Sequence, residues 1–124
     1  MSSAHNIAQG EFKPALKNTD EIELTVTGRT SARKTSRPVW FVVEGDTLYL
    51  LPVGGSDTEW FKNVLRNPTI ILAANGITWT AKAKPITDPL KVSQVVEKFR
   101  AKYGAGNVKK YYSKIDVAVE VPLT

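Results

Sequence analysis

The amino-acid sequence predicts a mainly β protein, a mostly antiparallel closed β-barrel of six strands with two or three helices. Short segments of alternating apolar and polar residues recur along the chain, and most of the connections between them are hairpin-like. No regular succession of strand and helix appears, which disfavours a doubly wound parallel sheet. The length of 124 residues fits one domain with one hydrophobic core.

Residues 1–20 are polar and mixed, and we interpret them as a partly flexible extension before a barrel domain at 21–124. One short helix is expected around residues 7–16, where Pro14 would interrupt it. The N-terminus has neither the basic nor the apolar region of a secretory signal, and no apolar run approaches about 18 residues. We therefore expect a cytoplasmic protein without an integral membrane segment.

The first three strands are expected at 21–27, 39–44 and 47–53. In the first of them, Ile22, Leu24 and Val26 alternate with polar residues, so that one face is buried and the other is wet. The second is apolar on both faces, and a Gly-Asp turn at 45–46 joins it to the third. Ser56 and Glu59 have capping-box spacing, which predicts a helix with Ser56 as N-cap that ends at Asn-Pro 67–68.

The second half of the chain repeats this pattern. Further strands are expected at 69–74, 77–85 and 115–121. Asn75-Gly76 is a strong hairpin signal between the first two of these strands. Asp88 as N-cap and Pro89 at the first helical position begin a helix that continues to Gly104, and a short turn or helix is expected at 107–113.

The composition excludes several kinds of chemistry. The chain has no cysteine, so it has neither disulfides nor thiolate nucleophiles, and no thiolate zinc site or iron–sulfur cluster is expected. Its single histidine, His5, lies in the polar N-terminal stretch, which argues against a Ser-His-Asp triad or a multi-histidine metal site. The carboxylates occupy turns, caps and wet strand positions, so no pair for hydrolysis is evident.

The charge balance of 17 basic against 12 acidic residues gives +5 and favours an anionic partner. Part of this charge forms a basic C-terminal region: Lys98, Arg100, Lys102, Lys109, Lys110 and Lys114. No nucleic-acid-binding motif accompanies the region, so we interpret it as a solvated face and expect no nucleic-acid partner.

The segment 28–37 is the first candidate binding element. It contains four cations, four hydroxyl side chains and no acid, and it lies between two predicted strands. Arginine forks match phosphate oxygens, and hydroxyls and loop amides supply further donors. The alternative is a solvated basic loop.

The second candidate is Gly54-Gly55, which precedes a helix N-terminus. Glycines let a ligand approach the backbone, and free amides at a helix start favour anions. The alternative is a plain strand-to-helix turn. Because this turn and the segment 28–37 flank the same hairpin, we expect both on one side of the barrel.

The aromatic residues divide into two groups. Trp60, Phe61 and Trp79 are expected in the core. Tyr111 and Tyr112 are neighbours on a short helix and point in different directions, so we expect one of them to line a cleft or a partner surface.

Several motifs together resemble the deazaflavin-dependent nitroreductase family. The matching segments are 28–31, 37–43, 45–50, 54–63 and 67–68, and the similarity spans 21–123. The family pattern in the first loop resembles Gly-Arg-Lys-Ser-Gly. Gly28, Arg29 and Ser31 match it, whereas Thr30 replaces the usual lysine and Ala32 the usual glycine.

The resemblance implies the split β-barrel of the flavin-binding, pyridoxamine-phosphate-oxidase-like superfamily. It also implies an oxidoreductase that binds coenzyme F420 and passes hydride from its reduced form to a quinone-like, nitro or other electron-poor acceptor. Arg29 and Ser31 would hold a phosphate, and Tyr111 or Tyr112 would close the substrate side. The implied cofactor-binding residues are Arg29, Thr30, Ser31, Arg33, Lys34, Arg37, Pro38, Pro52, Val53, Gly54, Gly55, Ser56, Trp60 and Asn63.

Three alternatives remain beside this reading. FMN is the second cofactor candidate, because its single phosphate needs only Arg29 and Ser31. A non-catalytic barrel that stores or carries a cofactor, or binds nucleic acid through its basic faces, is another. A degenerate barrel without a cofactor, indicated by Thr30 and Ala32, is the third. By analogy with split barrels that pair to complete their sites, we expect a homodimer without a bound metal.

Overall fold

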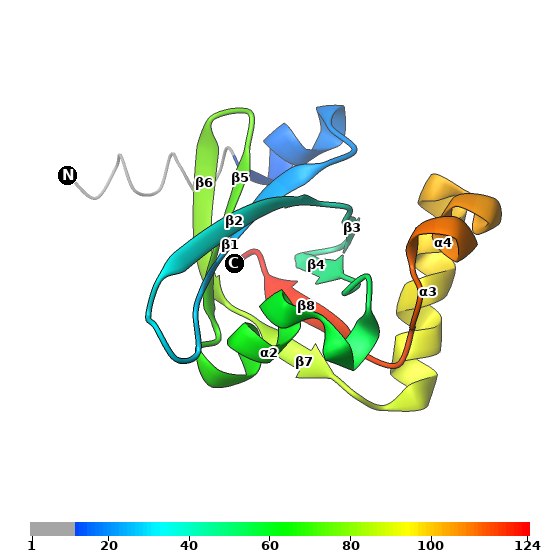
Figure 1. Cartoon of the computed structure of the whole chain (residues 1–124). Coiled ribbons are helices and arrows are strands. Elements are labelled where there is room, and N and C mark those ends of the chain that lie inside the picture. The colour runs from blue at the N-terminus through cyan, green and yellow to red at the C-terminus, as the bar shows by residue number, and fades with distance from the viewer. Residues whose placement is uncertain (1–11) are drawn as a thin grey trace.

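The computed structural model describes residues 12–124, which form two four-stranded antiparallel sheets (Figure 1). The order is β2-β1-β5-β6 in the first sheet and β3-β4-β8-β7 in the second. The strands are β1 (Ile22–Thr27), β2 (Lys34–Val39), β3 (Val42–Glu44), β4 (Thr47–Leu50), β5 (Thr69–Ala74), β6 (Ile77–Lys82), β7 (Lys84–Ile86) and β8 (Ala118–Pro122). The helical elements are η1 (Leu16–Asn18), η2 (Gly55–Asp57), α2 (Glu59–Arg66), α3 (Pro89–Tyr103) and α4 (Ala105–Tyr111).

The mainly β, antiparallel character is confirmed, but the closed six-stranded barrel is wrong. The described chain has eight strands, and neither sheet closes on itself. One extra strand is β2, which the sequence predicts as part of a basic loop. Five of its six residues are exposed, so its sequence carries no hydrophobic pattern that would mark it as a strand. The other arises because the expected strand 77–85 is interrupted at Ala83, where the chain leaves the first sheet for the second.

The main hydrophobic core lies between the two sheets. Leu24, Leu48, Ile70 and Val119 point into it and are fully buried. Phe12, in a helical turn at 12–15 that includes Pro14, joins this core, so the described end of the N-terminal extension packs against the domain. The rest of the helix expected at 7–16 lies outside the described residues.

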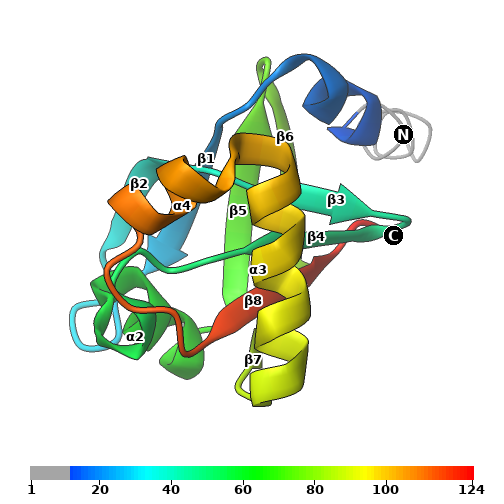
Figure 2. The same cartoon turned by 90° about the vertical axis from the view of Figure 1, so that its right-hand side faces the viewer.

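A second core lies between the second sheet and α3, which runs across that sheet (Figure 2). Val92, Val95, Val96 and Phe99 of α3 are buried in it. The second sheet is therefore covered on both faces: in β4, Leu48 and Leu50 belong to the main core, whereas Tyr49 packs against the second core. No helix among residues 12–124 is long and apolar enough to cross a bilayer.

Local signals explain where several elements begin and end. The Asp88 carboxylate accepts a hydrogen bond of 3.1 Å from the Lys91 amide, and Gly104 has a φ of 93°, so α3 begins and ends as predicted. Asn75 and Gly76 have φ of 51° and 80°, as a tight hairpin turn requires. Several expected bounds are wrong: the strand at 39–44 begins only at Val42, the strand at 47–53 ends at Leu50, and the last strand begins at Ala118. The short helix expected at 107–113 spans Ala105–Tyr111.

Candidate functional site

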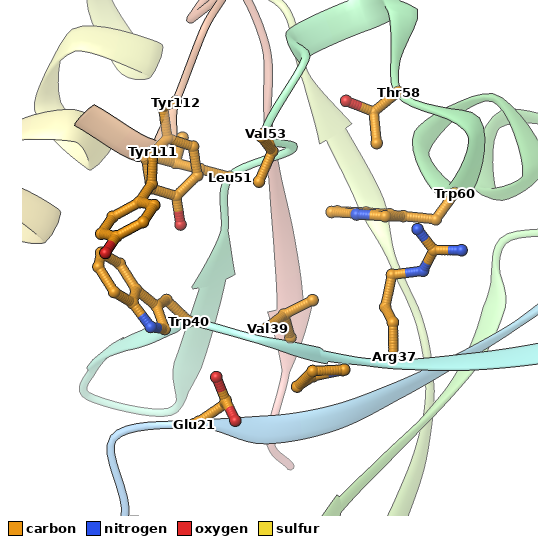
Figure 3. A pocket seen from close by; sticks show the side chains of 11 residues that line it. Glu21, Arg37, Val39, Trp40, Leu51, Val53, Thr58, Trp60, Tyr111 and Tyr112 are labelled. Atoms are coloured by element: carbon orange, nitrogen blue, oxygen red, sulfur yellow. The ribbon is translucent and has the colours of Figure 1, made fainter. Parts of the chain in front are cut away.

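A cavity of about 500 Å³ opens between β2 and the segment that connects β4 to α2 (Figure 3). Its walls combine four aromatic rings with aliphatic side chains, one cation and one carboxylate. The lining residues are Glu21, Arg37, Pro38, Val39, Trp40, Leu51, Val53, Thr58, Trp60, Tyr111 and Tyr112.

The pairing of β2 with β1 aims Arg37 at this cavity. Arg37 lies opposite Leu24, and Val39 opposite Ile22, so these side chains share the face that points toward the core. β2 is the last strand of its sheet, and the packed layer ends before it, which leaves Arg37 exposed. No hydrogen bond or ion pair joins its guanidinium to any side chain in the part of the chain that the structure describes.

Aromatic side chains form two opposite walls. Trp60, the second residue of α2, is 2% exposed and presents its indole on one side (Figure 3). Trp40 and Tyr111 form the other side, with ring centroids 5.5 Å apart and the planes at 78°. Trp40 also stacks on Tyr103, which lies outside the cavity lining, at 4.3 Å and 7°.

The hydroxyl of Tyr112 points toward the cavity (Figure 3). The residue is 7% exposed, and burial raises the pKa of its phenol well above the ordinary value. Within residues 12–124 the hydroxyl has no hydrogen-bond partner, whereas every fully buried side-chain polar atom has one. The hydroxyl is therefore a protonated donor that opens onto the cavity.

The segment 51–58 forms the third side. Val53 is 50% exposed at the rim, and its carbonyl accepts hydrogen bonds from the amide and hydroxyl of Ser113, at 2.9 and 3.2 Å. These bonds tie the end of α4 to the segment. The Thr58 hydroxyl accepts a 2.7 Å hydrogen bond from the Gly54 amide, so the turn that carries Thr58 into the cavity is closed by its own side chain.

The predicted capping role of Ser56 is wrong. The N-cap of α2 is Thr58, and Ser56 lies in the preceding turn η2. The Ser56 amide and hydroxyl both donate to the carboxylate of Asp116, at 2.9 and 2.5 Å, and these bonds lower the pKa of Asp116. Gly55 has a φ of 59°, and a Cβ there would lie 2.2 Å from the same carboxylate. The Gly55-Ser56 pair thus packs against the segment that precedes β8.

Arg29 and Asn63 meet each other rather than the cavity lining. The Asn63 side-chain oxygen accepts from the Arg29 amide and guanidinium, at 3.1 and 2.8 Å. The guanidinium also donates to Glu59 at 2.9 Å, a bond that holds the pKa of Glu59 below its ordinary value. Arg29 therefore ties the turn 28–33 to α2.

The structure brings only part of the predicted set together. Arg37, Pro38, Val53, Trp60, Tyr111 and Tyr112 line the cavity. Ser31 bonds the Arg33 amide within the turn 28–33, which also contains Thr30, and Lys34 lies on the outer face opposite Thr27. Pro52 is buried.

Five lining residues had not been predicted: Glu21, Val39, Trp40, Leu51 and Thr58. Trp40 and Leu51 belong to segments that are apolar on both faces, where the sequence gives no sign of which side opens. Thr58 was not predicted, because Ser56 was expected to be the N-cap of the helix that Thr58 caps in the structure. The alternation of the first strand predicts only that Glu21 is exposed to solvent, not that it borders a cavity.

This arrangement fits a planar aromatic ligand with an anionic group. The volume falls in the range of small-molecule sites, roughly 300–1,000 Å³, and the walls are apolar with a few convergent polar groups. Aromatic walls suit a flat ring, while Arg37 and Tyr112 supply a cation and a hydroxyl donor that have no hydrogen-bond partner among the described residues.

Comparison with known proteins agrees with this fold. A family model described as "Uncharacterized protein conserved in bacteria (DUF2255)" matches residues 14–120. No curated protein matches the chain.

Three solved structures share the fold. An F420-H2 dependent reductase (FDR-A) is 18% identical with a TM-score of 0.64, covering 82% of this chain and 93% of its own. A putative pyridoxamine 5'-phosphate oxidase from Listeria innocua is 16% identical with a TM-score of 0.63, covering 91% and 90%. HutZ, the heme storage protein from Vibrio cholerae, is 15% identical with a TM-score of 0.68, covering 91% and 87%. Identities this low establish a common fold and nothing about activity.

Proposed function

We propose that this chain, which belongs to the DUF2255 family, is an oxidoreductase that binds a flavin-type cofactor in the cavity beside β2, with coenzyme F420 as the first candidate. The observation that carries the proposal is the cavity itself, where aromatic walls meet two donors, Arg37 and the Tyr112 hydroxyl, that lack partners among the described residues. The similarity to an F420-H2 dependent reductase supports the choice of cofactor class.

When bound, such a cofactor supplies the hydride chemistry, with a quinone-like, nitro or other electron-poor molecule as acceptor. The chain supplies binding, orientation and exclusion of water. Arg37 would pair with an anionic group, and Trp60 and Trp40 would supply the aromatic walls for a flat ring. Tyr112 holds a proton at its hydroxyl oxygen and directs it into the cavity, since burial keeps the phenol protonated.

FMN is the second cofactor candidate, and the charge of the lining favours it. Arg37 is the one cation among the lining residues and Glu21 the one carboxylate, so the wall suits a single phosphate. A longer polyanionic tail would need the cations of the turn 28–33, where Arg29 is already engaged with Glu59. A non-catalytic carrier is the remaining alternative, and the similarity to a heme storage protein keeps it in view.

A homodimer is part of the proposal. Val53 and Tyr111 are each about half exposed at the rim of the cavity, and a second copy of the chain over that rim would bury them. Size-exclusion chromatography with light scattering tests this: a mass of twice 13.7 kDa is expected, and a monomer at all concentrations would contradict it.

The proposed function is tested by equilibrium dialysis of the purified protein against F420 and FMN in turn, followed by absorption spectra. Binding and a spectral shift with F420 support the first candidate, and binding of FMN alone moves the assignment to the second. Binding of neither would refute the proposal. Oxidation of the reduced cofactor by a soluble benzoquinone then separates an enzyme from a carrier, which would bind without accelerating turnover.

A further inference from the structure

Trp40 and Phe41 form the corner at which the chain leaves the first sheet and enters the second. β2 ends at Val39 and β3 begins at Val42, so these two residues belong to neither strand. Trp40 lines the cavity, while Phe41 is 1% exposed and belongs to the main core. The place of this corner therefore sets the place of one aromatic wall.

Tyr103, the last residue of α3, holds the corner through its hydroxyl. The hydroxyl oxygen accepts a hydrogen bond of 3.1 Å from the Phe41 amide. Its own proton has two carbonyl acceptors, Phe41 at 2.9 Å and Asp20 at 2.8 Å. The ammonium of Lys102 donates to the same Phe41 carbonyl at 2.8 Å. The end of α3 thus binds both polar groups of Phe41.

The ring of Tyr103 supports Trp40 directly. The two rings are nearly parallel, and their centroids lie 4.3 Å apart, so the tyrosine covers one face of the indole. On the helix side the tyrosine ring packs against Phe99, at 5.9 Å. The indole surface that Tyr103 leaves free belongs to the cavity, together with Tyr111 and Tyr112.

We propose that Tyr103 is a positioning residue of the cavity, which fixes Trp40 as the surface on which the ring of a planar ligand rests. The inference rests on the proposed function, because it assigns the ring-binding wall of the same site. Tyr103 itself does not line the cavity, so it acts through Trp40. Without it, the site should lose affinity for the ring and keep its affinity for the anionic group at Arg37.

The experiment compares Tyr103→Leu and Tyr103→Phe with Tyr49→Phe as the matched control. Tyr49 is a half-buried tyrosine of β4 that packs on the second core and lies outside the cavity lining. Each variant is titrated with F420, with FMN, with lumiflavin, which has the ring without a phosphate, and with inorganic phosphate. Thermal unfolding reports stability separately.

For Tyr103→Leu we expect affinity for lumiflavin and for the bound cofactor to fall about tenfold, as loss of an aromatic contact allows, while phosphate binding stays unchanged. Tyr103→Phe keeps the ring stacked on Trp40 and loses the hydroxyl bonds to Phe41 and Asp20. We therefore expect a smaller loss of affinity, about threefold, with faster cofactor release. Tyr49→Phe should match the wild type.

Unchanged lumiflavin affinity in folded Tyr103→Leu would overturn the inference, as would an equal loss for lumiflavin and phosphate, which is the mark of a general structural defect. If Tyr103→Leu does not fold, Tyr103→Phe decides: behaviour identical to Tyr49→Phe refutes the role. Wild type that binds lumiflavin but neither cofactor contradicts the proposed function, and the lumiflavin affinity of Tyr103→Leu then decides the role of Tyr103 alone. Wild type that binds none of these probes refutes both.

Discussion

Replacing Arg37 by glutamine removes the one cation that lines the cavity and keeps a polar, uncharged side chain. No ion pair holds the Arg37 guanidinium within residues 12–124, and the residue is exposed, so the free energy of unfolding should change by less than about 0.5 kcal/mol. The expected defect is in binding. A hydrogen bond between ionised groups contributes roughly 1.5–3 kcal/mol, which corresponds to an increase of about 10- to 150-fold in the dissociation constant of the cofactor.

Isothermal titration at two salt concentrations measures this change. The difference between wild type and Arg37→Gln should shrink at high salt, because an open site is screened. Arg29→Gln is the comparison variant: it breaks the bonds to Glu59 and Asn63, so it should cost up to about 1 kcal/mol of stability and less affinity than Arg37→Gln. A larger loss of affinity in Arg29→Gln than in Arg37→Gln would refute the reasoning and return the phosphate to the turn 28–33.

The remaining predictions concern packing, pH and turnover. Gly55→Ala should lower the free energy of unfolding by about 3 kcal/mol, because its Cβ would collide with the Asp116 carboxylate. Gly45→Ala is the control: Gly45 has a similar φ of 61° but open space around it, so this variant should lose only about 1 kcal/mol. Equal losses of the two variants in urea denaturation would contradict the prediction. Burial raises the pKa of Tyr103 from 10.0 to about 12, so above pH 10 the unfolded chain releases this proton before the folded chain does, and the free energy of unfolding falls as pH rises. Tyr103→Phe should flatten this decline between pH 10 and 12. An unchanged slope of stability against pH, measured by chemical denaturation, would argue against a buried phenol. Tyr112→Phe keeps the packing and removes the donor, so acceptor reduction should slow at least about tenfold in steady-state assays while thermal stability is kept; full activity would exclude Tyr112 as the donor.

Local signals predicted those parts of the fold that short-range chemistry decides. Asn75-Gly76 and Asp88-Pro89 act only on the backbone next to them: the first pair adopts the positive φ of a tight turn, and Asp88 caps the helix that begins at Pro89. The structure confirms both the turn and the helix start. Ser56 shows the opposite case. Its spacing to Glu59 is that of a capping box, yet Asp116, sixty residues away in sequence, binds its hydroxyl and amide. A pattern of neighbouring residues cannot reveal that a residue so far away in sequence binds the same side chain.

The same limit applies to the site. The segment 34–37 is polar on both faces, so no hydrophobic alternation marks it as a strand, and its pairing with β1 alone makes it one. Of the two candidate loops, the segment 28–37 reaches the cavity at Arg37, whereas Gly54 and Gly55 do not line it and only the preceding Val53 does. The resemblance implies Arg29 for the phosphate, but in the folded chain its guanidinium donates to Glu59 and Asn63, which are 30 and 34 residues away in sequence.

The position of β2 carries a hazard that its composition counteracts. One side of this strand pairs with β1, and the other presents free backbone groups on which a strand from another molecule can assemble. Pro38 has no N–H to offer such a ladder, and Lys34 and Arg37 make mutual approach of two such strands repulsive. Pro38 and Arg37, which line the cavity, therefore also make the free edge of β2 less suited to pairing with a strand of another molecule. Variants that replace Pro38 or Arg37 by apolar residues will endanger solubility before they reveal anything about binding.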